Sequence, residues 1–165
     1  RGQTWTDRSI EGFDDVPHTE DIHHIELVNK DTMVASTGSG LFRSADTGRT
    51  WERLDTDHRQ RYFREAFVHK GTIYAGGAPG SSSTWGDDTD HALFECHDAG
   101  RLERVSSPTP EEVIVGWCTI GDEILAGTHR GTLLQRDSGG WESIGRVIPN
   151  ASTPVRYLPL SWYAP

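Results

Sequence analysis

The stretch from Ile22 to Leu54 decides the fold, and it reads IHHIELVNKDTMVASTGSGLFRSADTGRTWERL. An alternating apolar run is followed by a polar turn, a second β-rich run that ends in glycine, a third run, and a tight turn into a fourth. Short apolar runs separated by Gly, Asn and Asp are typical of β-strands joined by short turns. The stretch therefore predicts four short strands in one antiparallel meander.

The same pattern returns twice, in residues 62–106 and 113–145. The matched positions are Val34, Tyr74 and Leu125 in the second strands, Leu41, Leu93 and Leu133 in the third strands, and Asp46, Asp98 and Asp137 in the turns. The second copy is longer because it carries an insertion at 77–91. Repeats of about 40 residues with four strands each predict a β-propeller.

We therefore expect an all-β fold, a β-propeller of four-stranded antiparallel blades. The expected blades are three full ones, 22–54, 62–106 and 113–145, between two partial ones, the last strand of a preceding blade in 1–10 and the first strand of a further blade in 153–165. Propellers usually close with about 4–8 blades. We therefore expect an incomplete ring or a fragment, which additional blades or a second copy of the chain would complete.

The turn of the first repeat carries a motif at Ser44, Asp46, Gly48, Thr50 and Trp51. It resembles the S-x-D-x-G-x-T-W Asp-box, or BNR repeat, of sialidases, sortilin-type receptors and photosystem-assembly propellers. The resemblance implies a structural turn away from the central pocket, in which Asp accepts amide hydrogen bonds, Gly supplies a positive φ and Trp packs between blades. The later copies are degenerate and keep Asp98, Asp137 and Trp141.

The chain is acidic, with a formal net charge of −9. An acidic surface repels phosphate backbones, so the charge argues against nucleic acid as a general partner. Only two of the 16 basic residues are lysines, a composition that resembles proteins of halophilic archaea; an acidic protein from a GC-rich genome is the alternative. No apolar run approaches the length of a membrane-spanning helix.

The resemblance to sialidases raises an enzyme hypothesis, an exo-sialidase-like glycoside hydrolase. Such enzymes are expected to use an arginine triad for the substrate carboxylate, a tyrosine nucleophile with a glutamate partner, and an acid/base aspartate. Arg64 and Glu65 on one predicted first strand, and Arg156 and Tyr157 on another, are the catalytic candidates. The alternative is that these side chains form ion pairs in a polar channel, and further blades would have to supply the rest of a catalytic site.

Three residues are candidates for binding a ligand. Trp85 lies in the Gly/Ser/Asp-rich insertion, where an exposed ring can stack on a sugar or on a partner side chain. The other two, His23 and Trp117, lie on predicted first strands. His23 and His24 are adjacent, so we expect them to point to opposite faces of their strand.

The insertion also carries three acids, Asp87, Asp88 and Asp90. Alternate acids on a loop suit Ca²⁺, but this string lacks the fuller EF-hand pattern. We therefore expect no cofactor, with calcium as the one alternative.

Taken together, these features favour a non-catalytic propeller that acts as a recognition or assembly module for a protein or glycan partner. The alternative is a sialidase-like or other glycoside hydrolase whose full site needs the missing blades. The fold hosts many activities, so the function depends on the site and not on the motif.

Overall fold

The computed structural model describes residues 4–13, 16–87, 90–98, 100–147 and 155–161. These residues form twelve strands and no helix. Sheet 1 contains β1 (Ile22–Leu27), β2 (Met33–Thr37), β3 (Gly40–Ser44) and β4 (Glu52–Arg53). Sheet 2 contains β5 (Tyr62–His69), β6 (Thr72–Ala78), β7 (Ala92–Cys96) and β8 (Glu103–Val105). Sheet 3 contains β9 (Ile114–Ile120), β10 (Glu123–Thr128), β11 (Thr132–Asp137) and β12 (Gly140–Arg146).

Each sheet is an antiparallel meander whose strands follow chain order. Local turn chemistry explains this order. The β5–β6 hairpin turns at Lys70 and Gly71, whose φ angles are 50° and 82°, a pair of positive values that suits a tight hairpin. Between β1 and β2, Asn29 Oδ1 accepts the backbone N–H groups of Asp31 and Thr32 at 2.9 Å each. The prediction of an all-β fold built from four-stranded antiparallel units is confirmed.

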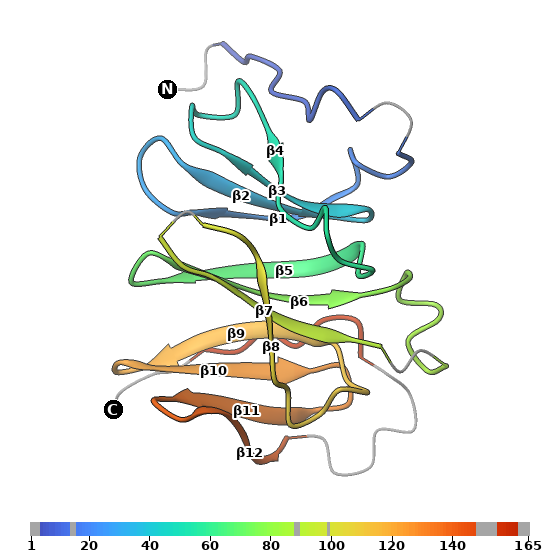
Figure 1. Ribbon diagram of the computed structural model, residues 1–165, viewed down its shortest axis with the longest axis vertical. Coiled ribbons are helices and arrows are strands. Elements are labelled where there is room, and N and C mark those ends of the chain that lie inside the picture. The colour runs from blue at the N-terminus through green and yellow to red at the C-terminus, as the bar shows by residue number, and fades with distance from the viewer. Residues whose placement is uncertain (1–3, 14–15, 88–89, 99, 148–154, 162–165) are drawn as a thin grey trace.

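The three sheets lie one after another along the molecule, from sheet 1 near the N-terminus to sheet 3 near the C-terminus (Figure 1). The first strands are neighbours, because β1 contacts β5 and β5 contacts β9. The arrangement is propeller-like, and none of the three sheets closes on itself. The first strands of the three sheets are therefore adjacent in the order β1, β5, β9, and side chains from neighbouring first strands can line one site.

Apolar side chains hold neighbouring sheets together. Between sheets 1 and 2, Val34 and Leu41 pack with Phe63 and Phe94, and all four are fully buried. The second interface, between sheets 2 and 3, is centred on a buried Trp117. Alternation along the strands places one set of side chains toward each neighbouring sheet.

The N-terminal segment differs from the strand expected in 1–10. Its described part, residues 4–10, contains no strand. Ile10 is buried against Ala35 and Phe42, and the indole N–H of Trp51 donates to the carbonyl of Arg8 at 3.3 Å. The segment therefore covers sheet 1 through side chains and not through a hydrogen-bonded ladder.

The C-terminal segment also differs from the strand expected in 153–165. Its described part, residues 155–161, contains no strand. The N–H of Val155 donates to the carbonyl of His129 at 2.8 Å, and that of Leu158 donates to the carbonyl of Val115 at 3.4 Å. The Leu158 carbonyl passes so close to Gly116 that a Cβ there would lie 1.8 Å from its oxygen. The segment crosses β9 without becoming a strand.

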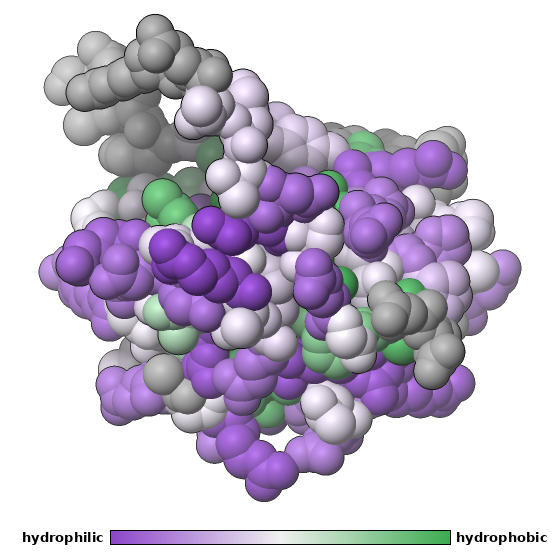
Figure 2. All heavy atoms as spheres, turned by 90° about the horizontal axis from the view of Figure 1, so that it is seen from above, coloured by the Kyte–Doolittle hydropathy of each residue, from purple (hydrophilic) through white to green (hydrophobic). Residues whose placement is uncertain are grey.

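Hydrophilic side chains cover most of the face shown in Figure 2, and its apolar spots are scattered. This face of the molecule is therefore mainly polar. In the part of the chain that the structure describes, no helix is long and apolar enough to cross a membrane.

Candidate functional site

A hollow of about 380 Å³ lies on the first strands of sheets 1 and 2. Its lining is His23 and His24 from β1, Arg64 and Glu65 from β5, and Tyr157 from the C-terminal segment. We call it the first-strand hollow. The structure thus brings together four residues that the sequence singled out, Arg64, Glu65, Tyr157 and His23.

Breaks in strand register aim these side chains into the hollow. The β1–β2 register shifts between Ile22 and His24, and the β5–β6 register shifts between Phe63 and Ala66. Bulges of this kind redirect side chains and are common beside functional sites. His23 and His24 both line this hollow, at a point where the register shift interrupts the regular alternation that the sequence analysis assumed.

Glu65 is an incompletely hydrogen-bonded lining residue. Its Oε2 is buried and has no hydrogen-bond partner among the described residues. Burial, and then the charge of Glu26, raise the pKa of Glu65 to about 7, although Arg64 opposes the shift. Near neutral pH this carboxyl group therefore exists in both protonation states, and it can donate or accept a hydrogen bond.

Two of the other lining groups, Arg64 and His23, are held by hydrogen bonds to backbone carbonyls. The Nε–H of Arg64 donates to the carbonyl of Arg156 at 3.1 Å, so Arg156 contributes its backbone to the site. His23 Nδ1 lies 2.8 Å from the carbonyl oxygen of Phe63, and its Nε2 lies 3.3 Å from Asp21 Oδ2. The second histidine, His24, has a buried Nδ1 with no partner in the described part of the chain. The sequence analysis missed His24, because only the bulge brings it here.

Two of the predicted ligand-binding aromatics are core residues. Trp85 is fully buried, and its ring centroid lies 5.9 Å from Tyr62 and 5.5 Å from His129. Trp117 is 5 % exposed and stacks on Phe67 at 6.1 Å. Trp85 is therefore not the exposed stacking ring that the sequence suggested, because an indole that can be buried gains more from apolar contact than from solvent.

The acids of the insertion do not form a metal site in the described residues. Asp90 pairs with Arg104 at 3.0 Å and with Arg59 at 3.7 Å. Asp87 lies exposed in a turn, and Asp88 lies outside the described residues. Within the described ranges, no group of three His, Cys, Asp or Glu residues is placed to hold a metal ion.

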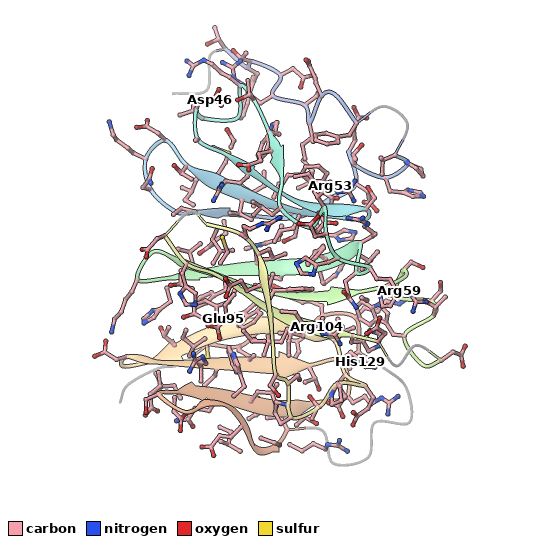
Figure 3. The ribbon with its side chains drawn as sticks, viewed as in Figure 1. Asp46, Arg53, Arg59, Glu95, Arg104 and His129 are labelled. Carbon is pink, nitrogen blue, oxygen red and sulfur yellow. The ribbon has the colours of Figure 1, made fainter. Side chains whose placement is uncertain are left out.

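The motif of the first repeat forms a self-contained turn. Asp46 Oδ1 accepts hydrogen bonds from the Ser44 hydroxyl and the Thr50 N–H, both at 2.9 Å, and Oδ2 accepts from the Thr50 hydroxyl at 2.8 Å. These bonds, led by that of the Thr50 N–H, lower the pKa of Asp46 to about 2. Gly48 adopts a φ of 80°. The carboxylate oxygens of Asp46 thus accept hydrogen bonds from within the turn. Asp46 lies at the opposite end of sheet 1 from Arg53 (Figure 3).

The later turns keep parts of this arrangement. Asp137 Oδ1 accepts the N–H groups of Gly139 at 2.7 Å and Gly140 at 3.0 Å. Asp98 adopts a φ of 47° and is exposed. Trp141 packs toward sheet 2, where its indole N–H donates to Glu95 at 2.8 Å.

Comparison with known proteins shows the fold and not a family. No known protein family matches the chain, and no curated protein matches it. Among solved structures, the computationally designed Ika4 protein is similar at a TM-score of 0.58 and 12% identity, over 98% of this chain and 89% of that one. The extracellular domain of BT4673 from B. thetaiotaomicron is similar in two structures, at TM-scores of 0.56 and 0.55 and identities of 18% and 17%. These matches cover 76% and 82% of this chain but only 17% and 18% of the BT4673 chains. The chain has a propeller-like all-β fold.

Proposed function

We propose that this chain is a non-catalytic recognition module, and that the first-strand hollow binds a polar group of a protein or glycan partner. The volume of about 380 Å³ lies in the range of small-molecule pockets. It is large enough for one sugar ring or one polar side chain. The lining offers a cation, an ionisable carboxyl group, two imidazoles and a phenol, which suit hydroxyl and anionic groups.

The observation that carries this proposal is the pair of unsatisfied atoms, Glu65 Oε2 and His24 Nδ1. Leaving a buried polar atom without a partner costs about 1–3 kcal/mol. A protein that only needed a stable channel would gain by pairing or replacing these groups. A bound ligand that hydrogen-bonds them recovers this free energy, so the arrangement favours binding.

We also propose that the fold is an Asp-box propeller, with the three sheets as blades of a ring that other elements complete. The turn at Ser44–Trp51 supports this proposal, since its Asp, Gly and Thr make the contacts that the motif implies. A further support is that a large apolar side chain on or directly before each fourth strand packs toward the preceding part of the chain. Leu102 packs toward sheet 1, Trp141 toward sheet 2, and Trp51 toward the N-terminal segment.

Binding at the hollow is tested by adding neutral and acidic sugars to the protein and measuring the NMR chemical shifts of the β1 and β5 amides. Replacement of Glu65 by leucine should abolish the shifts and leave the fold intact, because leucine fits a buried position. The matched control is Glu103→Leu, on an exposed position of β8 in the same sheet. Equal binding by the wild type and the Glu65→Leu variant would contradict the proposal.

A sialidase-like hydrolase is the second candidate, because Arg64, Glu65 and Tyr157 line one hollow. In that mechanism tyrosine is the nucleophile, glutamate its partner and arginine the ligand of the substrate carboxylate. The test is turnover of a fluorogenic sialoside at high salt, with Tyr157→Phe as the inactive variant. Turnover that survives this substitution, or no turnover by a folded protein that carries the complete ring, excludes catalysis by these residues.

A further inference from the structure

A second hollow, of about 440 Å³, opens where connecting segments of sheets 1 and 2 meet. We call it the rim pocket. Its apolar walls include Val16, Pro17 and Pro79, from the segment before β1 and from the start of the insertion. It shares no lining residue with the first-strand hollow, so it is a separate site.

One buried acid holds two arginines at the rim pocket. Asp55 is fully buried, and it accepts hydrogen bonds from Arg53 Nε at 3.2 Å and from Arg61 Nη1 at 2.8 Å. Arg53 also donates to the carbonyl of Ser39, and its guanidinium lies 5.5 Å from the ring centroid of Phe42. Two guanidinium groups and one carboxylate carry a net charge of +1, within a chain whose net charge is −9. Two guanidinium groups therefore lie at the rim pocket with one buried carboxylate, and the carboxylate of Asp21 lies beside the lining residue Gly38.

Ser39 adds an unsatisfied hydroxyl to this lining. The residue is 8 % exposed, and its Oγ has no hydrogen-bond partner in the part of the chain that the structure describes. Its backbone is fixed, because its N–H donates to Thr37 Oγ1 at 3.1 Å. An oxygen atom of a ligand would give this hydroxyl the acceptor that the protein does not provide.

We propose that the rim pocket binds an apolar group that carries one carboxylate, either a small organic acid or the C-terminal residue of a peptide. The carboxylate accepts hydrogen bonds from Arg61, Arg53 and the Ser39 hydroxyl, while the apolar group packs on the walls. Each guanidinium group has five N–H donors, and those that Asp55, Ser39 and Thr56 do not use can donate to a ligand carboxylate. Asp55 orients both forks before the ligand arrives.

The first experiment compares 3-phenylpropionate with its neutral amide, using the NMR shifts of the Gly38, Ser39 and Gly80 amides. We expect saturable shifts with the acid at millimolar concentration and at least tenfold weaker binding of the amide. A tripeptide ending in phenylalanine, as the free acid and as the C-terminal amide, distinguishes the two sources. Tighter binding of the free-acid peptide than of 3-phenylpropionate identifies a chain terminus, and the reverse order identifies a small acid.

The second experiment uses serine variants. Ser39→Ala should weaken binding of the acid about threefold or more, whereas Ser36→Ala should not. Ser36 is the matched control because its Oγ is also buried without a partner among the described residues, but it lies outside the pocket lining. Arg61→Lys keeps a charge beside Asp55 and removes the fork, so it should also weaken binding. Equal affinity for the acid and the amide, no shift with the acid, or equal effects of the two serine variants would each overturn the proposal.

Discussion

Two of the three glutamates of sheet 2 have contrasting surroundings, Glu95 on β7 and Glu65 on β5. Glu95 is buried at the interface with sheet 3, where Arg136 Nε and the Trp141 indole N–H each donate to Oε1 at 2.8 Å, and His97 lies 3.2 Å away (Figure 3). Glu65 lines the first-strand hollow and has a buried oxygen with no partner in the described residues. Both residues have the same type of side chain, but Glu95 is hydrogen-bonded by its neighbours and Glu65 keeps an oxygen that accepts no hydrogen bond from the described residues.

The two pKa values move in opposite directions for this reason. Burial by itself would raise the pKa of Glu95, but the hydrogen bonds from Arg136 and Trp141 outweigh burial and lower it. Burial prevails at Glu65 and raises the pKa to about 7. A paired buried carboxylate is a structural part of an interface, whereas an unpaired one is available to a ligand. The contrast therefore assigns a structural role to Glu95 and makes Glu65 the candidate for binding a ligand.

The largest expected effect is at Glu95. Glu95→Gln removes the charge that pairs with Arg136, so we expect the free energy of unfolding to fall by about 3 kcal/mol, as for other broken buried ion pairs. Chemical denaturation at pH 7 measures it. The same substitution at Glu65 is the matched control and should not destabilise the protein. Equal losses at both positions would remove the distinction between the two glutamates.

Gly116→Ala tests how far the hollow depends on the C-terminal segment. The new Cβ would collide with the Leu158 carbonyl, so the segment must shift. We expect a loss of about 2 kcal/mol, typical of overpacking, together with weaker ligand binding at the hollow, because Tyr157 would move. The control is Gly145→Ala, where no atom lies within 4 Å of the added Cβ. Unchanged binding in the Gly116 variant would show that the segment is not part of the site.

The repeats predicted the sheets well, because hydrophobic alternation and turn residues report directly on strands. They did not predict the bulges beside His23 and Glu65, which follow from how neighbouring strands fit and not from residue type. Trp85 was misplaced because its sequence surroundings are polar, while the pocket that buries it is made by Tyr62 and His129, distant in sequence. Arg64, Glu65 and Tyr157 do line one hollow, but Tyr157 reaches it from a segment that is not the expected strand. Which of their polar atoms have partners depends on the three-dimensional structure and not on residue type.

Glu65 should make stability depend on pH in the direction opposite to Glu95. Its folded pKa is raised, so its contribution is complete below about pH 4.5 and is lost as pH rises through about 7. Between pH 5 and 8 the free energy of unfolding of the Glu65→Gln variant should therefore rise by about 1 kcal/mol relative to the wild type. The rise is limited to this size because Glu65 keeps some contact with water. Denaturation midpoints across this range measure the gain. Other charged or titratable groups near the hollow are His23, His24, Glu26, Arg64 and Tyr157.

A ligand that pairs with Glu65 should change this pH dependence. If the ligand donates a hydrogen bond to the Glu65 carboxylate, the ligand stabilises the wild type. The difference in the free energy of unfolding between the variant and the wild type should then become smaller. A variant whose stability follows the wild type at every pH would show that Glu65 titrates normally, and the contrast with Glu95 would then rest on geometry alone.

The smallest expected effect on stability is at Asp46. This residue distinguishes the effect of hydrogen bonding from the effect of burial. Asp46 is fully paired, like Glu95, but it lies in an exposed turn, so water replaces much of what a substitution removes. Asp46→Asn should lower the melting temperature slightly, and less than Glu95→Gln does. Its lowered pKa gives stability that is present above about pH 4 and lost as pH falls through about 2, so the gap between variant and wild type should close in acid. Thermal melts at pH 7 and pH 2 measure it, with Asp57→Asn as the control, since Asp57 is an exposed partner of Arg101. A loss as large as that at Glu95 would mean that pairing alone, without burial, determines what a carboxylate contributes to this fold.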